Sequence, residues 1–110
     1  MPVIKHSFHP YLVLDFWSKA ARRALSMLRR RERPVLTGEV ALWIGVSLQQ
    51  TTTLLDDLEE KGLIRQATRA ELSSSSQMGH AYLLIDPTLI PRGDWEAVPI
   101  SLLGAPPKLE

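Results

Sequence analysis

Apolar residues recur at intervals of three and four over residues 10–31, which predicts one long amphipathic helix. Its main apolar strip consists of Leu14, Trp17, Ala21, Ala24, Leu25 and Leu28, and a second strip beside it consists of Val13, Phe16, Ala20 and Met27. One domain needs only one such strip on a surface helix. We therefore expect one strip to pack on its own domain and the other on a further surface, such as a second subunit. Pro34 ends the helix.

The next segment predicts two helices joined by a tight turn. Thr37 is a suitable N-cap for a short helix over residues 38–44, and Gly45 ends that helix. Ser47 and Gln50 have the spacing of a capping box, which starts a second helix. Its buried face consists of Thr51, Leu54, Leu55 and Leu58, and Gly62 closes it.

Two strands are expected after this helix, over residues 64–72 and 79–85, joined by the Ser-rich loop at residues 73–79. Prolines break the chain from Pro87 onward, although this segment also holds several apolar residues that could dock: Trp95, Val98, Ile100, Leu102 and Leu103. The predicted organisation is an N-terminal arm (1–9), one domain (10–87) and a Pro-rich C-terminal segment (88–110).

The composition is typical of a soluble globular protein, with 45% hydrophobic and 23% charged residues among 110. We expect a cytoplasmic protein, because no apolar run approaches the ~18 residues of a membrane span and the first residues lack the features of a secretory signal. The net charge of +1 hides an uneven distribution. Seven bases and one acid lie between Lys19 and Arg33, whereas four acids and one base lie between Asp56 and Lys61.

Catalytic and metal chemistry find little support. The chain has no cysteine, and its three histidines, His6, His9 and His80, do not have the spacing of a metal motif. The serines at 73–76 lack a recognisable base, and no phosphate-binding or dinucleotide-binding motif is present. We therefore expect no enzyme, no cofactor and no metal site.

The motif GVS at 45–47, followed by LLDDLEEKGLI at 54–64 and two strands, resembles the winged helix-turn-helix transcription regulators, most closely the MarR-like and related bacterial families. The resemblance covers residues 36–85. It implies an α+β fold, mainly α, with a long N-terminal helix and a two-stranded wing. It also implies a homodimer that regulates transcription by binding duplex DNA, with the second motif helix in the major groove and the wing on the backbone.

By this resemblance the DNA-contacting residues are Ser47, Leu48, Gln49, Gln50, Thr52, Thr53, Arg65 and Arg69. Asp57 is expected on the same outward face. Glutamine can pair with adenine through two hydrogen bonds, and threonine can contact a base, a thymine methyl group or a phosphate. Alternation along a strand would place Arg65 and Arg69 on one face. The basic run 29–33 is either a phosphate contact or a solvated helix end.

Two departures from the family pattern favour an alternative, a winged helix that binds proteins, as in an assembly adaptor or a component of secretion or conjugation. The second motif helix carries more acids than bases, and Leu42 and Trp43 occupy positions that are normally polar. Trp43 is either covered by a chain terminus or contacts a partner. The residues expected at a dimer or partner interface are Leu14, Trp17, Ala21, Leu25, Leu28, Leu42 and Trp43.

Overall fold

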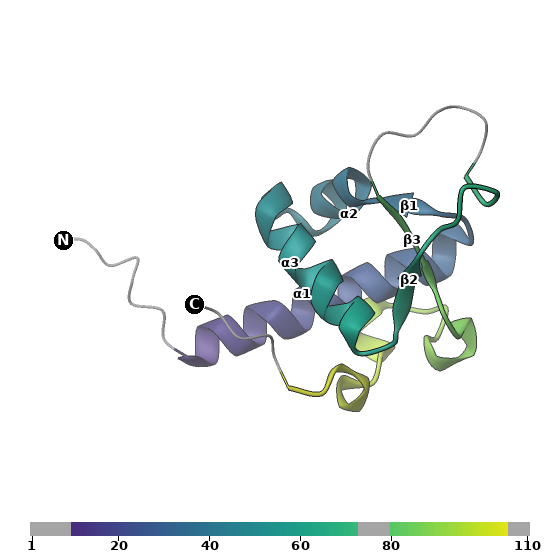
Figure 1. The fold of residues 1–110 in the computed structure, drawn as a ribbon. Coiled ribbons are helices and arrows are strands. Elements are labelled where there is room, and N and C mark those ends of the chain that lie inside the picture. The colour runs from purple at the N-terminus through teal and green to yellow at the C-terminus, as the bar shows by residue number, and fades with distance from the viewer. Residues whose placement is uncertain (1–9, 73–79, 106–110) are drawn as a thin grey trace.

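The computed structural model describes the backbone of residues 10–72 and 80–105, and the side chains of these residues from Phe16 onward. Within these ranges the fold is α+β and mainly helical, with three α-helices and a small antiparallel sheet (Figure 1). The elements follow in the order α1 (Pro10–Arg31), β1 (Val35–Leu36), α2 (Thr37–Ile44), α3 (Leu48–Glu60), β2 (Ile64–Gln66) and β3 (Ala81–Leu84). Three short 3-10 turns follow in the described part of the C-terminal segment, at Pro87–Leu89, Trp95–Ala97 and Ile100–Leu103. The predicted arm at residues 1–9 and the Ser-rich loop lie outside the described residues.

Helix α1 has the predicted bounds, but its two apolar strips are used differently from the prediction. Ala21, Leu25 and Leu28 are buried within this chain, as are Ala20 and Met27 from the second strip. The interface role predicted for Ala21, Leu25 and Leu28 is therefore wrong, because their surface is already occupied by the protein's own core. Trp17 is half-buried against the same core, and the side chain of Leu14 is not among those described.

The turn between α2 and α3 is built as the sequence predicted. Gly45 adopts a left-handed conformation with φ 74°, which a residue with a Cβ atom rarely adopts, and it ends α2. The Ser47 hydroxyl accepts a hydrogen bond from the Gln50 N–H at 3.0 Å, so this capping box is confirmed. The predicted cap of α2 is displaced by one residue. Thr37 is the first helical residue, and Glu39 instead accepts the Leu36 N–H at 2.9 Å.

The sheet has three strands in the described part of the chain, in the order β1-β3-β2, rather than the two strands that were predicted. Val35 pairs with Tyr82, and Ile64 pairs with Leu84, both in antiparallel register. Strand β2 ends at Gln66 instead of reaching residue 72, because the chain then turns over residues 68–72. The short pairing of β1 ties the start of α2 to the centre of the sheet.

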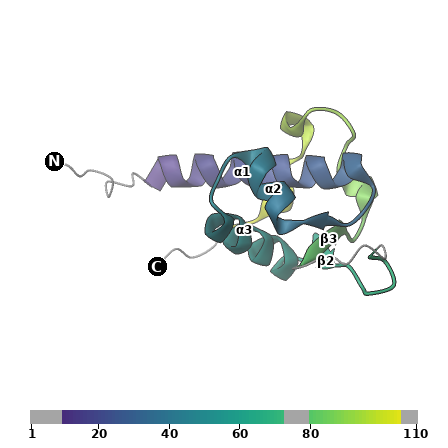
Figure 2. The same cartoon turned by 90° about the horizontal axis from the view of Figure 1, so that it is seen from above.

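The C-terminal segment packs against α1 and completes the core (Figure 2). Ile90, Val98 and Leu103 are buried in the same cluster as the α1 and α3 residues, so the core extends past the predicted boundary at residue 87. The Arg29 Nε donates to the carbonyl oxygen of Ile90 at 2.9 Å. The guanidinium groups of Arg22 and Arg23 lie 4.8 and 5.3 Å from the ring centre of Trp95. Arginines of α1 therefore hold this segment in place.

None of the helices in the described part of the chain combines the length of a membrane span with a sufficiently apolar composition.

Candidate nucleic-acid interface

The first two turns of α3 form an exposed surface, named here the α3 face: Leu48, Gln49, Gln50, Thr52 and Thr53. The helix spacing explains this exposure. Thr51, Leu54, Leu55 and Leu58 point into the core and fix the helix, so the residues between them point outward. Leu48 is the apolar member of this face, and 59% of its surface is exposed. The sequence therefore predicted the exposed residues of the first two turns correctly.

Hydrogen bonds within α3 determine which polar atoms of the α3 face are available. The side-chain oxygen of Gln50 lies 3.4 Å from the Ser47 N–H and 3.3 Å from the Ser47 hydroxyl, so it is engaged at the cap. The hydroxyls of Thr52 and Thr53 donate to the carbonyl oxygens of Leu48 and Gln49, at 3.0 and 3.2 Å. Gln49 makes no side-chain hydrogen bond to the described residues, so its amide keeps both donors and an acceptor.

Asp57 does not lie on the outward surface of α3, contrary to prediction. Only 8% of its surface is exposed, and its carboxylate lies 2.8 Å from the ammonium group of Lys61. Lys61 also donates to the carbonyl oxygen of Ala105 and lies 4.3 Å from the ring centre of Trp17. This pair links α3 to α1 and to the C-terminal segment. Asp56 and Glu60 are the exposed acids of the helix, and both lie in its second half.

Arg65 is held by Glu71, an acid that was not among the predicted site residues. Its guanidinium makes two hydrogen bonds to the carboxylate of Glu71, at 2.8 and 2.7 Å. Glu71 also accepts the Thr68 N–H at 2.8 Å. These bonds, the one from Arg65 above all, lower the pKa of Glu71 to about 2, and the same pair raises the pKa of Arg65.

The predicted common strand face of Arg65 and Arg69 is therefore wrong. Arg69 lies in the turn after β2, where Thr68 and Glu71 cap each other's N–H groups. The sequence Thr-x-x-Glu at 68–71 is itself a capping-box pattern, and it was the available signal that the strand ends before this point. The same signal identifies Glu71 as a residue with a structural role.

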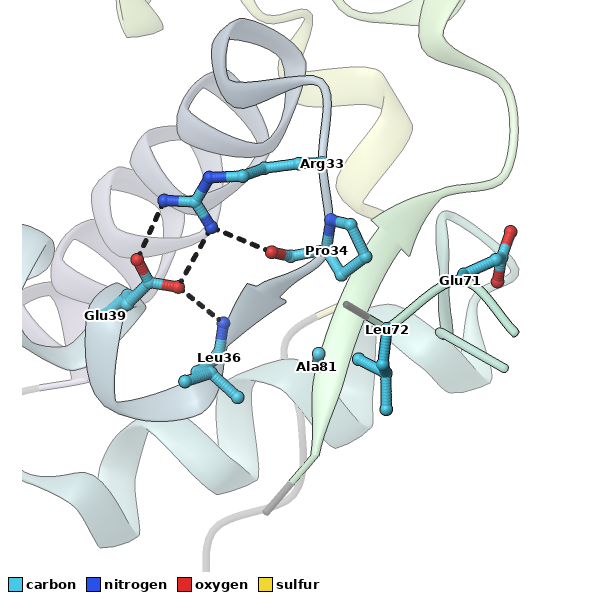
Figure 3. Close-up of a pocket in the computed structure, with 7 residues that line it drawn as sticks. All are labelled: Arg33, Pro34, Leu36, Glu39, Glu71, Leu72 and Ala81. Carbon is cyan, nitrogen blue, oxygen red and sulfur yellow. Dashed lines mark hydrogen bonds and ion pairs between the residues drawn. The ribbon is translucent and has the colours of Figure 1, made fainter. Parts of the chain in front are cut away.

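The basic run 29–33 is only partly available to a partner. Arg29 is committed to the Ile90 carbonyl, and Arg33 makes two bonds to Glu39, at 3.3 and 2.9 Å (Figure 3). The Arg33 bond lowers the pKa of Glu39, and Glu39 in turn raises the pKa of Arg33. Arg30 lies over the Trp43 ring at 5.2 Å, and Arg31 is exposed.

A groove of about 270 Å³ lies between the start of α2, the edge of the sheet and the turn after β2 (Figure 3). The Arg33–Glu39 pair lies at one end of it and Glu71 at the other, and the Glu71 carboxylate points away from that pair. Leu36, Leu72 and Ala81 line the space between them. The groove thus combines an apolar floor with ion-paired ends and offers no concentrated positive charge.

Comparisons with family models, with curated proteins and with solved structures returned no match. Among the described residues, no cluster of three or more His, Asp or Glu side chains could hold a metal ion.

Leu42 and Trp43 form a second exposed surface on α2. Their exposed fractions are 87% and 47%, so the described part of the chain leaves Leu42 largely uncovered and Trp43 about half covered. Trp43 lines a shallow hollow of about 210 Å³ together with Met27, Arg30 and Arg31. An exposed pair of large apolar side chains beside arginines is typical of a contact surface.

Proposed function

We propose that this protein is a winged helix-turn-helix regulator that binds duplex DNA as a homodimer, with α3 in the major groove and the β2–β3 hairpin against the backbone. The order helix, strand, helix, helix, strand, strand supports this fold. The observation that carries the function is the α3 face, a row of exposed, uncharged side chains with hydrogen-bonding capacity on a helix fixed by its buried side. Charged acids on that helix are confined to its second half.

The ion pairs of the arginines are compatible with this function. An ion pair between exposed side chains contributes little to stability, so a phosphate can replace the carboxylate of Glu71 on Arg65 at small cost. Arg31 and Arg69 are exposed and add charge without breaking an ion pair to a described residue. We infer moderate affinity for the DNA backbone with few phosphate contacts, because so few cations are available.

The homodimer requires a surface other than Ala21, Leu25 and Leu28. Phe16 is the first residue of α1 whose side chain is described, and about half of its surface is exposed. Trp17, the next residue, is half-buried. We place the dimer contact on this end of α1, next to Leu14 in the sequence. A dimer arranged in this way would present two copies of the α3 face to one duplex.

The direct test is fluorescence anisotropy of a labelled random-sequence duplex titrated with the protein from low to physiological salt. We expect micromolar binding that weakens as salt increases, with a shallow slope set by the small number of phosphate contacts. Arg69→Ala should weaken binding to all sequences, whereas Arg92→Ala is the matched control, because it removes the same charge from the C-terminal segment. Absence of binding at low salt, with the protein folded by circular dichroism, would reject the DNA-binding function.

The second candidate function is a winged helix that binds a protein partner, as an assembly adaptor or a component of secretion or conjugation. The exposure of Leu42 and Trp43 favours it. Sedimentation of the wild-type chain and of Leu42→Ser tests for self-association through this surface. A complex that dissociates in Leu42→Ser, together with absent DNA binding, would show that this surface binds protein and would favour this alternative.

A further inference from the structure

The α3 face lacks the side chains that most often recognise guanine. Between the cap at Ser47 and the buried Leu55, no exposed residue is charged, and none is an arginine or lysine. Guanine presents two acceptors, N7 and O6, in the major groove, and its commonest specific contact is a bidentate Arg or Lys. Recognition of G·C pairs by this helix would therefore lack its usual donor.

The available groups match an A·T pair. Adenine presents an acceptor and a donor, which a glutamine amide can bind together, and Gln49 has its whole amide available. Thymine presents a methyl group, which suits an exposed apolar side chain such as Leu48. The hydroxyls of Thr52 and Thr53 donate hydrogen bonds to carbonyl oxygens of the helix backbone. These two side chains therefore offer DNA their methyl groups and their acceptor oxygens.

The charge distribution along α3 sets which end enters the groove. The positive end of the helix dipole lies at the cap of Ser47, and the first turn contains no acid. Asp56 and Glu60 are exposed in the second half of the helix, where they would repel phosphates. The first two turns are thus electrostatically the better part of α3 to place between two phosphate backbones.

We propose that α3 selects A·T base pairs through the major groove, with Gln49 on adenine and the apolar groups of Leu48, Thr52 and Thr53 on the methyl groups of thymine. This inference rests on the proposed DNA-binding function, and it adds the class of base pair that is recognised.

The test compares the affinity of the folded full chain for four pools of labelled duplex of equal length, which contain A·T, G·C, inosine·C or A·uracil pairs. Inosine keeps the major-groove acceptors of guanine but lacks its minor-groove amino group, so I·C resembles A·T only in the minor groove. Uracil removes only the methyl group of thymine. We expect the protein to bind the A·T pool roughly tenfold more tightly than the G·C and I·C pools. Replacement of thymine by uracil should weaken its binding several-fold.

The variant Gln49→Ala should lose most of the preference for A·T over I·C and keep the folded circular dichroism spectrum. Ser101→Ala is the control, because it removes an exposed polar group from the last 3-10 turn, outside α3 and the β2–β3 hairpin, and it should keep that preference. Equal binding of A·T and I·C, or no effect of uracil, would overturn this inference and leave the DNA-binding function standing. Failure to bind any of the four pools at low salt would overturn both.

Discussion

Leu103→Ala tests whether the C-terminal segment is part of the core. The Leu103 side chain has 0% exposure in the last 3-10 turn, and it packs in the cluster that contains the buried residues of α1 and α3. Replacement by alanine removes three carbon atoms, which costs about 2.4 kcal/mol in transfer free energy at ~0.8 kcal/mol for each. The cavity that remains raises the cost to roughly 3–4 kcal/mol.

The assay is thermal and urea unfolding followed by circular dichroism at the helical signal. At about 4 °C per kcal/mol for a domain of this size, the midpoint of Leu103→Ala should fall by on the order of 12 °C or more. Ile100→Ala is the matched control, because Ile100 lies in the same turn with 61% of its surface exposed, and its midpoint should shift by at most about 2 °C. Equal shifts for the two variants would refute the packing of this segment on the core.

Three further predictions concern the charged pairs. Glu71→Gln should release Arg65 and tighten binding to random duplex DNA, and it should steepen the slope of log affinity against log salt by up to ~0.9. The carboxyl group of Glu71, followed by NMR, should titrate near its pKa of about 2, and in Arg65→Ala its pKa should rise toward the ordinary 4.5. Lys61→Met should lower the free energy of unfolding by roughly 1–3 kcal/mol, because it leaves the buried carboxylate of Asp57 without its cation and removes the bond to Ala105.

The first of these predictions has a control variant, and the other two have outcomes that would contradict them. Glu96→Gln removes one negative charge from the C-terminal segment, and an equal gain in DNA affinity there would show that only net charge matters. Since the folded-state pKa of Glu71 is depressed, its contribution to stability is fully present above pH 4.5 and is lost as the pH falls toward 2. An unchanged titration of Glu71 in Arg65→Ala would assign the shift to the Thr68 amide instead. Unchanged stability of Lys61→Met would mean that Asp57 finds another partner.

Local patterns were sufficient to predict the helices and the turn between them. The three- and four-residue spacing of apolar positions in α1, the Ser47–Gln50 capping box and the left-handed glycine at 45 each act within one turn of helix, so each is visible in a short stretch of sequence. The exposure of Leu48 and Gln49 followed from the same periodicity.

Most of the errors concern contacts between residues that are distant in the sequence, whereas the early end of β2 was signalled locally by Thr68 and Glu71. The pairing of β1 with β3, the Arg29 bond to Ile90 and the burial of Leu103 all depend on how the chain returns to itself. Nothing within the basic run 29–33 shows that Arg29 binds a carbonyl group 61 positions away, so its sequence does not decide between a phosphate contact and a solvated helix end. Asp57 is similar in part, since its partner Lys61 is held by the distant residues Trp17 and Ala105.

The wrapping of the C-terminal segment around α1 has a consequence for biosynthesis. The helices and the β2–β3 hairpin are complete in the chain by residue 84, but the surface of α1 that receives Ile90, Val98 and Leu103 stays uncovered until those residues emerge. The contacts of these residues with α1 close a long loop, because the two segments are far apart in the sequence. Closing that loop costs conformational entropy before the contacts form. A nascent chain stalled before residue 90 would thus hold a nearly formed helical unit with an open apolar flank, which is the kind of surface that chaperones bind.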